Sequence, residues 1–260
     1  MKKERPQIFI TNDDGIHAPG IKSLVKIVRP LGDIVLVAPD RPQSGMSHAI
    51  TLSSPLRFHK VKEEEGYRAY VCSGTPVDCV KLGLKIAMDG RKPSLLLSGI
   101  NHGSNASTNM IYSGTMAAAL EGAMEDIPSI GLSLLDYALE ADFEQSAEFI
   151  KQIIQNTLAQ PMPLRTCLNV NIPNLPATEL KGIKVCRQAM ALWKESYEMR
   201  KDPFHANYYW LTGEFHHTDL KEDTDLYALD HAYISVVPVQ FDWTDFARMD
   251  EYKKRLETHK

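Results

Sequence analysis

The chain has 260 residues, of which 43% are hydrophobic and 24% are charged, and its formal net charge is −4. This length and apolar content predict one large domain or two small ones with a substantial core, and they exclude a disordered chain. The slight negative charge argues against a basic face for nucleic-acid binding, while a small anionic substrate still fits a locally positive site.

Cysteine usage and hydropathy indicate where the protein works. The four cysteines form no C-x-x-C pair, which argues against a zinc ribbon or a thioredoxin-type site. Scattered thiols of this kind are typical of a reduced cytoplasmic protein. No apolar run is long enough for a signal peptide or for the roughly 20 residues of a membrane span. We therefore expect a cytoplasmic protein that does not contact a membrane.

The N-terminal segment predicts a strand, an acidic loop and a helix. Residues 8–10 are apolar and mostly β-branched, as in a buried strand, and Pro19 suits the first turn of a helix. Asp13 and Asp14 lie where the strand gives way to the loop. Two adjacent carboxylates repel each other unless a cation or a proton offsets the charge. A solvated Asn-Asp-Gly turn is the alternative, and the motif alone favours neither.

Strands and helices alternate through the rest of the chain. Residues 33–38 predict a second buried strand, and strand, helix and strand at this spacing predict a right-handed crossover with parallel strands. Pro55 places the strands expected within 48–61 near a sheet edge, and a polar loop is expected at 98–105. Further strands are expected at 67–71, 94–97, 127–134, 168–173, 183–187, 208–211 and 233–238. Helices are expected at 77–88, from 115, and at 143–158, 225–232 and 243–260.

This order predicts an α/β fold with a mostly parallel sheet. We expect the catalytic core in residues 1–160 and, in residues 161–260, an α/β extension that completes the core and carries projecting strands. Projecting strands with exposed aromatic residues suit subunit pairing. The alternative, that these segments wrap the same subunit, is equally compatible with the sequence.

Oxygen ligands follow three of the predicted parallel strands. Asp13 and Asp14 follow the first strand, Ser44 the second, and Asn101 the strand at 94–97. If these strands are neighbours, their loops meet at one edge of the sheet, where ligands of open α/β sheets bind. Carboxylate, hydroxyl and amide oxygens select a hard divalent ion such as Mg²⁺, Mn²⁺ or Ca²⁺ rather than zinc.

Ser113-Gly114-Thr115 stands just before a predicted helix. Free backbone N–H groups and the helix dipole favour an anion there, and Gly114 permits close approach of a ligand. Ordinary helix capping is the alternative and the more common use of such residues. A metal ion and an anion site together indicate phosphate ester chemistry, in which Asp13 or Asp14 orients or deprotonates a water.

Five runs of sequence resemble, in order, the motifs of one enzyme family. They are ITNDDGIHAPGI, APDRPQSGMSHAIT, SGTPVDCVKLGL, SGINHGSNAS and YSGTMAAALEGAM. Together they make the chain similar to the SurE family of survival-protein nucleotidases, in register over residues 10–134 and more loosely afterwards. Five motifs in the right order are far more specific than any one of them.

The resemblance implies a three-layer Rossmann-like core and a metal-dependent phosphatase that acts on nucleoside 5′- or 3′-monophosphates, with polyphosphate shortening in some members. It also implies one divalent ion per subunit, Mg²⁺ or Mn²⁺ with Ca²⁺ as an option in crystals. A cytoplasmic homodimer or homotetramer with exchanged C-terminal segments is expected. The family's metal ligands fall on Asp13, Asp14, Ser44 and Asn101, and its phosphate contacts on Asn105, Ser113, Gly114 and Thr115.

Other families fit less well. Haloacid-dehalogenase-type phosphatases need D-x-D, whereas the carboxylates here are adjacent, and zinc deacetylases have proline where this chain has Asn12. A Rossmann dehydrogenase needs G-x-G-x-x-G after the first strand, and this motif is absent from the sequence. A non-catalytic sensor that binds nucleotide or phosphate through the same loops remains the alternative to an enzyme.

Overall fold

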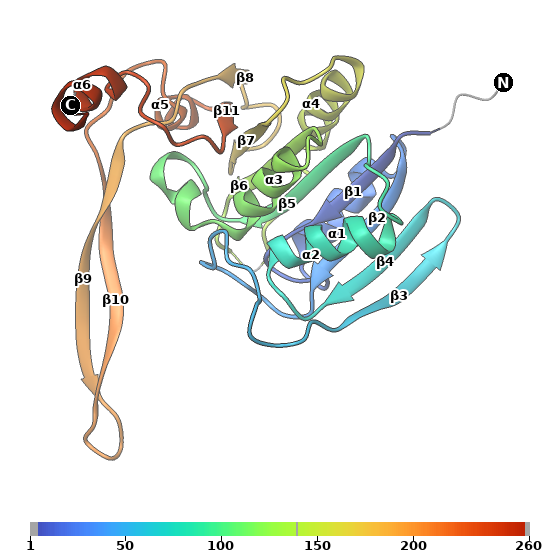
Figure 1. Ribbon diagram of the computed structural model, residues 1–260, viewed down its shortest axis with the longest axis horizontal. Coiled ribbons are helices and arrows are strands. Elements are labelled where there is room, and N and C mark those ends of the chain that lie inside the picture. The colour runs from blue at the N-terminus through green and yellow to red at the C-terminus, as the bar shows by residue number, and fades with distance from the viewer. Residues whose placement is uncertain (1–4, 139, 258–260) are drawn as a thin grey trace.

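The computed structural model describes residues 5–138 and 140–257. A nine-stranded sheet carries helices on both faces, and a two-stranded hairpin projects away from it (Figure 1). The strands are β1 (Gln7–Thr11), β2 (Asp33–Pro39), β3 (Phe58–Glu64), β4 (Tyr67–Cys72), β5 (Leu95–His102), β6 (Ser129–Leu135), β7 (Thr166–Pro173), β8 (Gly182–Val185), β9 (Ala191–Lys201), β10 (Asn207–His217) and β11 (Tyr233–Gln240).

Among the described residues no helix has the length and apolar character needed to cross a bilayer. The helices are α1 (Pro19–Val28), α2 (Pro76–Leu82), the π-helical turn η1 (Gly83–Ala87), the 3₁₀ helix η2 (Ser107–Tyr112), α3 (Gly114–Met124), α4 (Ala147–Ala159), α5 (Asp225–Asp230) and α6 (Met249–Leu256).

The strand order of the sheet is β3-β4-β2-β1-β5-β6-β7-β11-β8. Strands β4, β2, β1, β5, β6 and β7 run parallel to one another. Strand β3 pairs antiparallel with β4, and β11 pairs antiparallel with β7 and parallel with β8. The predicted α/β class with a mostly parallel sheet is therefore confirmed. Since β1 pairs with both β2 and β5, the carboxyl ends of these strands meet at one edge of the sheet.

Both faces of the central strands are buried. Ile8 and Ile10 pack with residues of α1 and α4, while Phe9 between them packs with residues of α2 on the opposite face. Side chains of a strand alternate between the two faces, so a strand covered on both sides reads as a continuous apolar run. The fold therefore has three layers, with α1 and α4 on one face and α2, α3 and α5 on the other.

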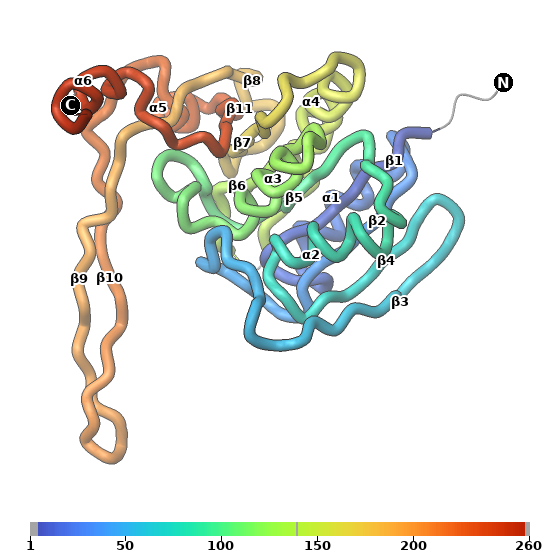
Figure 2. The backbone as a smooth tube through the Cα atoms, viewed as in Figure 1, coloured from blue at the N-terminus to red at the C-terminus, as the bar shows by residue number. Residues whose placement is uncertain are grey.

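The chain after residue 160 contributes to two different parts of the fold. Strands β7, β11 and β8 extend the central sheet. Between β8 and β11 the chain leaves the sheet, forms the hairpin β9–β10 and returns, as Figure 2 shows along the backbone. Residues 192–201 of β9 are all exposed, so this strand has no face against the core.

The largest differences from the sequence prediction are in three regions, and the C-terminal helix, expected over 243–260, begins only at Met249. Strand β9 was not predicted, because it buries no face and shows no burial pattern. Strand β5 extends through most of the expected polar loop, where a bulge between Ser98 and Asn101 shifts its register with β6. Residues 48–57 contain no strand, and only β3, the edge strand after Pro55, forms from that region.

Candidate functional site

Three segments converge at the carboxyl ends of β1, β2 and β5. Asp13, Ser44 and Asn101 line one cavity of about 270 Å³ together with Asn105 and Ser113. The loops are tied by their backbones, since the Gln43 N–H donates to the Asp13 carbonyl oxygen at 2.7 Å. The sequence analysis expected four oxygen ligands from separate loops. Three of them, Asp13, Ser44 and Asn101, line this cavity, whereas Asp14 is outside its lining.

Asp13 is held against the N-terminus of α3. Its carboxylate accepts a 2.5 Å hydrogen bond from the Thr115 hydroxyl, and a Cβ added at Gly114 would lie only 2.9 Å from the Asp13 Cβ. Gly114 therefore permits the close approach of helix and carboxylate. Burial raises the pKa of Asp13 to about 6 against the lowering effect of the Thr115 bond, and the charge of Asp14 adds to the rise.

Asp14 lies beside the end of β5. The His102 backbone nitrogen donates to the Asp14 Oδ2 at 3.4 Å. Burial raises the pKa of Asp14, while this hydrogen bond and the charge of His102 act to lower it. Within residues 5–138 and 140–257, no three His, Cys, Asp or Glu side chains are arranged to hold a metal. An ion at this site would therefore take hydroxyl and amide oxygens as its remaining ligands, which suits a hard divalent cation.

Asn101 is oriented by the end of β5. Its Nδ2 donates to the Gly103 carbonyl oxygen at 2.8 Å, which leaves the side-chain oxygen Oδ1 for a ligand. A β-bulge before Asn101 shifts the register of β5 with β6, and bulges of this kind commonly redirect side chains beside functional sites. Ser44 is exposed in the loop after β2, so its hydroxyl is open to a ligand in the same cavity.

Ser113 caps helix α3. Its hydroxyl oxygen accepts from the Met116 N–H at 3.1 Å, so the capping alternative is confirmed for this residue. Ser113 also lines the cavity with Asp13. A capping hydroxyl accepts one bond and keeps its own proton for a second partner, so capping and anion binding are compatible.

Asn105 is fixed by a buried polar network. The Asn105 N–H donates to the Asn171 Oδ1 at 2.8 Å, and its side-chain Nδ2 donates to the Ser133 Oγ at 2.9 Å. Asn169 Nδ2 donates to the Asn105 carbonyl oxygen at 2.8 Å. Asn105 itself is 6% exposed and lines the cavity. Buried hydrogen bonds of this kind, to both the backbone and the side chain of Asn105, hold the residue in one position.

The cavity has aromatic walls that the sequence analysis did not single out. Tyr112, Tyr137 and Trp193 line it together with Asn109. Tyr112 directly precedes the motif Ser113-Gly114-Thr115, so its closeness to the site could be expected from the sequence. Trp193 belongs to strand β9, which was not predicted. Its position at the site depends on contacts between segments far apart in the chain, and no local pattern reports such contacts.

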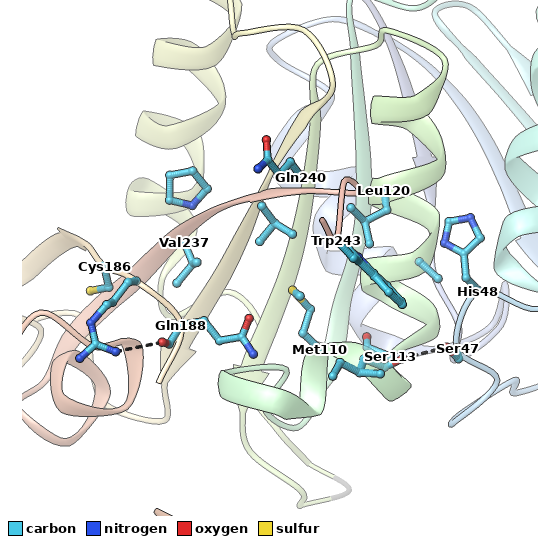
Figure 3. A pocket seen from close by; sticks show the side chains of 15 residues that line it. Ser47, His48, Met110, Ser113, Leu120, Cys186, Gln188, Val237, Gln240 and Trp243 are labelled. Atoms are coloured by element: carbon cyan, nitrogen blue, oxygen red, sulfur yellow. Dashed lines mark hydrogen bonds between the residues drawn. The ribbon is translucent and has the colours of Figure 1, made fainter. Parts of the chain in front are cut away.

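A larger cavity of about 510 Å³ lies beside the site and shares Ser113 with it. Figure 3 shows its lining, with Trp243 near Leu120 and with His48 at the same end. The His48 Nε2 is 2.9 Å from the Glu121 Oε2, and Lys81 pairs with the other oxygen of this carboxylate. Glu121 thus joins the loop after β2 to helices α2 and α3.

Comparisons with known proteins show which family this chain resembles along its length. The family model described as survival protein SurE matches residues 8–195. A "5′-nucleotidase SurE" from Christiangramia forsetii is 56% identical over 246 residues and covers 94% of each chain. One from Flavobacterium johnsoniae is 53% identical and covers 96% of this chain and 97% of the relative. A crystal structure of a SurE protein from Aquifex aeolicus has a TM-score of 0.83 and 38% identity, and covers 96% of this chain and 99% of that one.

Proposed function

The chain belongs to the SurE family, and from this membership and the site geometry we propose that it is a 5′-nucleotidase, a phosphoric monoester hydrolase. One observation supports the chemistry most directly: Asp13, Ser44 and Asn101 line the same cavity as Ser113, at the N-terminus of α3. Oxygen ligands for a cation thus lie next to a helix N-terminus, which is a favourable binding site for an anion. A phosphate ester can bind the cation and the helix N-terminus at the same time.

The proposed metal ligands are Asp13, Asp14, Ser44 and Asn101. Paired carboxylates with raised pKa values fit a cation, because a positive charge offsets both their burial and their mutual repulsion. One divalent ion per subunit, Mg²⁺ or Mn²⁺, is proposed. When bound, such an ion polarises a phosphoryl oxygen and lowers the pKa of a coordinated water.

The protein's own groups account for the remaining chemistry. Asn105, Ser113, Gly114 and Thr115 are proposed to surround the phosphate, with the Thr115 hydroxyl bound to Asp13. The Ser113 hydroxyl can donate its proton to a phosphate oxygen while it caps α3. The Asp13 and Asp14 carboxylates are the groups that can orient the attacking water or accept its proton.

Release of phosphate from 5′-AMP tests this function. Wild-type protein with Mn²⁺ or Mg²⁺ should release phosphate, excess chelator should stop the release, and Asp14→Asn should lose most turnover while keeping its circular-dichroism spectrum. Nearly normal activity in Asp14→Asn would contradict the proposed site. Assays with 3′-AMP and with polyphosphate extend the same test to the proposed 3′-nucleotidase and exopolyphosphatase activities.

A non-catalytic sensor that uses the same loops is the alternative. It predicts AMP binding that depends on a divalent ion without release of phosphate. Binding by calorimetry and phosphate release, measured on one preparation, separate the two functions.

We also propose that the hairpin β9–β10 pairs subunits into a homodimer or homotetramer with exchanged C-terminal segments. Large apolar side chains on the hairpin are exposed, among them Tyr197, Met199, Tyr209 and Trp210. Exposed aromatic and methionine side chains are enriched in protein interfaces. Residues 161–260 then have two roles, since they also supply β7, β8 and β11. The mass in solution, measured by light scattering, tests this proposal.

The four cysteines are free and buried. Free thiols are typical of a reducing compartment, and we propose a cytoplasmic setting on this ground. Fractionation of cells followed by immunodetection tests it.

A further inference from the structure

Aromatic side chains from three separate elements surround the mouth of the candidate site. Tyr112 ends η2, Tyr137 follows β6, and Trp193 lies on β9. They are 58%, 75% and 47% exposed, yet all three line the cavity that contains Asp13. Large aromatic rings that remain open to solvent beside a polar site are available to bind a flat ligand.

Two of the three rings, those of Trp193 and Tyr137, are held by contacts with neighbouring residues. The Trp193 Nε1–H donates to the Asn109 Oδ1 at 2.7 Å, and the ring of Phe215 lies 5.4 Å from that of Trp193. Tyr137 lies against Gly103, where an added Cβ would be 2.4 Å from a ring carbon, and its hydroxyl accepts from the Ser104 N–H at 3.3 Å. Rings positioned before binding lose little freedom when a ligand arrives.

A second cavity continues from the site. Its volume is about 450 Å³, and it shares Tyr112 and Trp193 with the site cavity. The rest of its lining comes from Glu195 of β9 and from residues 211–213 of β10. The two cavities differ in chemistry, since the first contains the oxygen ligands and the second has mostly apolar and aromatic walls. A nucleoside monophosphate has the same division between its phosphate and its base.

We propose that Tyr112 and Trp193 form the subsite for the nucleotide base, with Tyr137 at its outer edge, and that they bind the base by stacking. This inference rests on the proposed nucleotidase function of the adjacent site. Stacking is tolerant of base identity because every base has a π-face. The enzyme should therefore accept purine and pyrimidine nucleotides and discriminate against phosphate esters that lack a base.

A comparison of AMP with ribose 5-phosphate tests the subsite, because ribose 5-phosphate has a hydroxyl at C1′ where AMP has the base. In wild-type protein the KM should be lower for AMP. Trp193→Ala should raise the KM for AMP about tenfold, which corresponds to a loss of about 1.4 kcal/mol of stacking, and should leave the KM for ribose 5-phosphate nearly unchanged. Trp193→Phe keeps a ring and should retain most of the preference.

Trp210→Ala is the matched control. Trp210 is 57% exposed on the same hairpin and pairs with Glu198, outside both cavities. Any change in assembly would move both KM values together, so the ratio of the two KM values is the criterion. An unchanged ratio in Trp193→Ala overturns the proposal. The proposal is also overturned if Trp243→Ala, and not Trp193→Ala, removes the preference for AMP over ribose 5-phosphate. The base would then bind in the larger cavity, which Trp243 and His48 line.

Calorimetry keeps this test separate from that of the proposed function. If wild-type protein hydrolyses neither compound, the nucleotidase function fails, and the Kd values for AMP and ribose 5-phosphate replace the KM values. Trp193→Ala should then weaken AMP binding alone. Equal Kd values for AMP in wild-type and Trp193→Ala protein would show that no stacking subsite exists.

Discussion

The Thr115 hydroxyl donates to the Asp13 Oδ1 at 2.5 Å, across 102 positions of sequence. Thr115 is the second residue of α3 and Asp13 follows β1, so this bond fixes the carboxylate relative to the helix N-terminus. Neither residue is more than 4% exposed. A hydrogen bond to an ionised group is stronger than one between neutral groups, and burial removes the competing water.

Thr115→Val should therefore weaken the fold and the site together. The variant keeps the β-branched shape but leaves the buried carboxylate without its donor, which should lower the free energy of unfolding by about 1–3 kcal/mol. Turnover of AMP should also fall, because Asp13 is no longer fixed. Urea denaturation of the chelated protein and steady-state kinetics measure the two effects. Thr115→Ser retains the hydroxyl and should stay close to wild type, and equal losses in both variants would contradict this role of the hydroxyl.

Asp13 should make the metal-free protein less stable as the pH rises. Its pKa is raised from 3.8 to about 6 in the folded state, mainly by burial. Such a carboxyl contributes stability below its unfolded pKa and loses that contribution as the pH rises through its folded pKa. The shift corresponds to about 3 kcal/mol.

Urea denaturation in excess chelator, from about pH 4 to about pH 8, measures this dependence. The free energy of unfolding of wild type should fall by up to about 3 kcal/mol relative to that of Asp13→Asn. Added Mn²⁺ at the upper pH should recover stability in wild type alone, because a ligand that binds only the folded state stabilises it. Parallel pH profiles for the two proteins would exclude a raised pKa at Asp13.

Local sequence pattern is sufficient for part of the site. Strands β1 and β2 are continuous apolar runs, and the polar residues after them, including Asp13, Asp14 and Ser44, mark where each strand ends. Asn101 was expected in a loop but lies on β5, which continues through His102. Small polar residues resemble a loop in sequence, whereas pairing with β6 across the bulge keeps them in the sheet.

The aromatic part of the site depends on long-range packing. Trp193 reaches the cavity because β9 packs against η2, where the indole N–H donates to Asn109 across 84 positions of sequence. Strand β9 is exposed on both faces beyond Ala191, so hydrophobic alternation carries no information about it. A residue of this kind can be assigned only when the contacts between distant segments are known.

Glu121→Gln should destabilise the protein most at neutral pH. Burial raises the pKa of Glu121, but the hydrogen bonds and positive charges of His48 and Lys81 outweigh it, so that the pKa is lowered overall. A carboxyl with a lowered folded pKa contributes stability above its unfolded pKa and loses it as the pH falls through the folded pKa. We expect a loss of about 1–3 kcal/mol at about pH 7.

The difference between Glu121→Gln and wild type should shrink in acid, as followed by urea denaturation at several pH values. Glu125→Gln is the matched control, since Glu125 is exposed just after the end of the same helix, and it should change the free energy of unfolding by less than about 0.5 kcal/mol. A loss in Glu121→Gln that is independent of pH would show that the charge of Glu121 is not what stabilises α3.

Three asparagines form a closed ring of hydrogen bonds behind the site. The Asn105 N–H donates to Asn171, the Asn171 side chain donates to Asn169 at 2.9 Å, and the Asn169 side chain donates to the Asn105 carbonyl oxygen. Asn169→Ala leaves the Asn105 carbonyl and the Asn171 amide unpaired in the interior. The free energy of unfolding should fall by about 1–3 kcal/mol.

The same variant should raise the KM for AMP more than it lowers kcat, because Asn105 is proposed to contact the phosphate while the carboxylates keep their own partners. Asn174→Ala removes the same side chain from an exposed position and should change neither property. Urea denaturation and steady-state kinetics distinguish the roles of the ring. A loss of stability with an unchanged KM would mean that the ring supports only the fold, and that the backbone of Asn105 keeps its position without it.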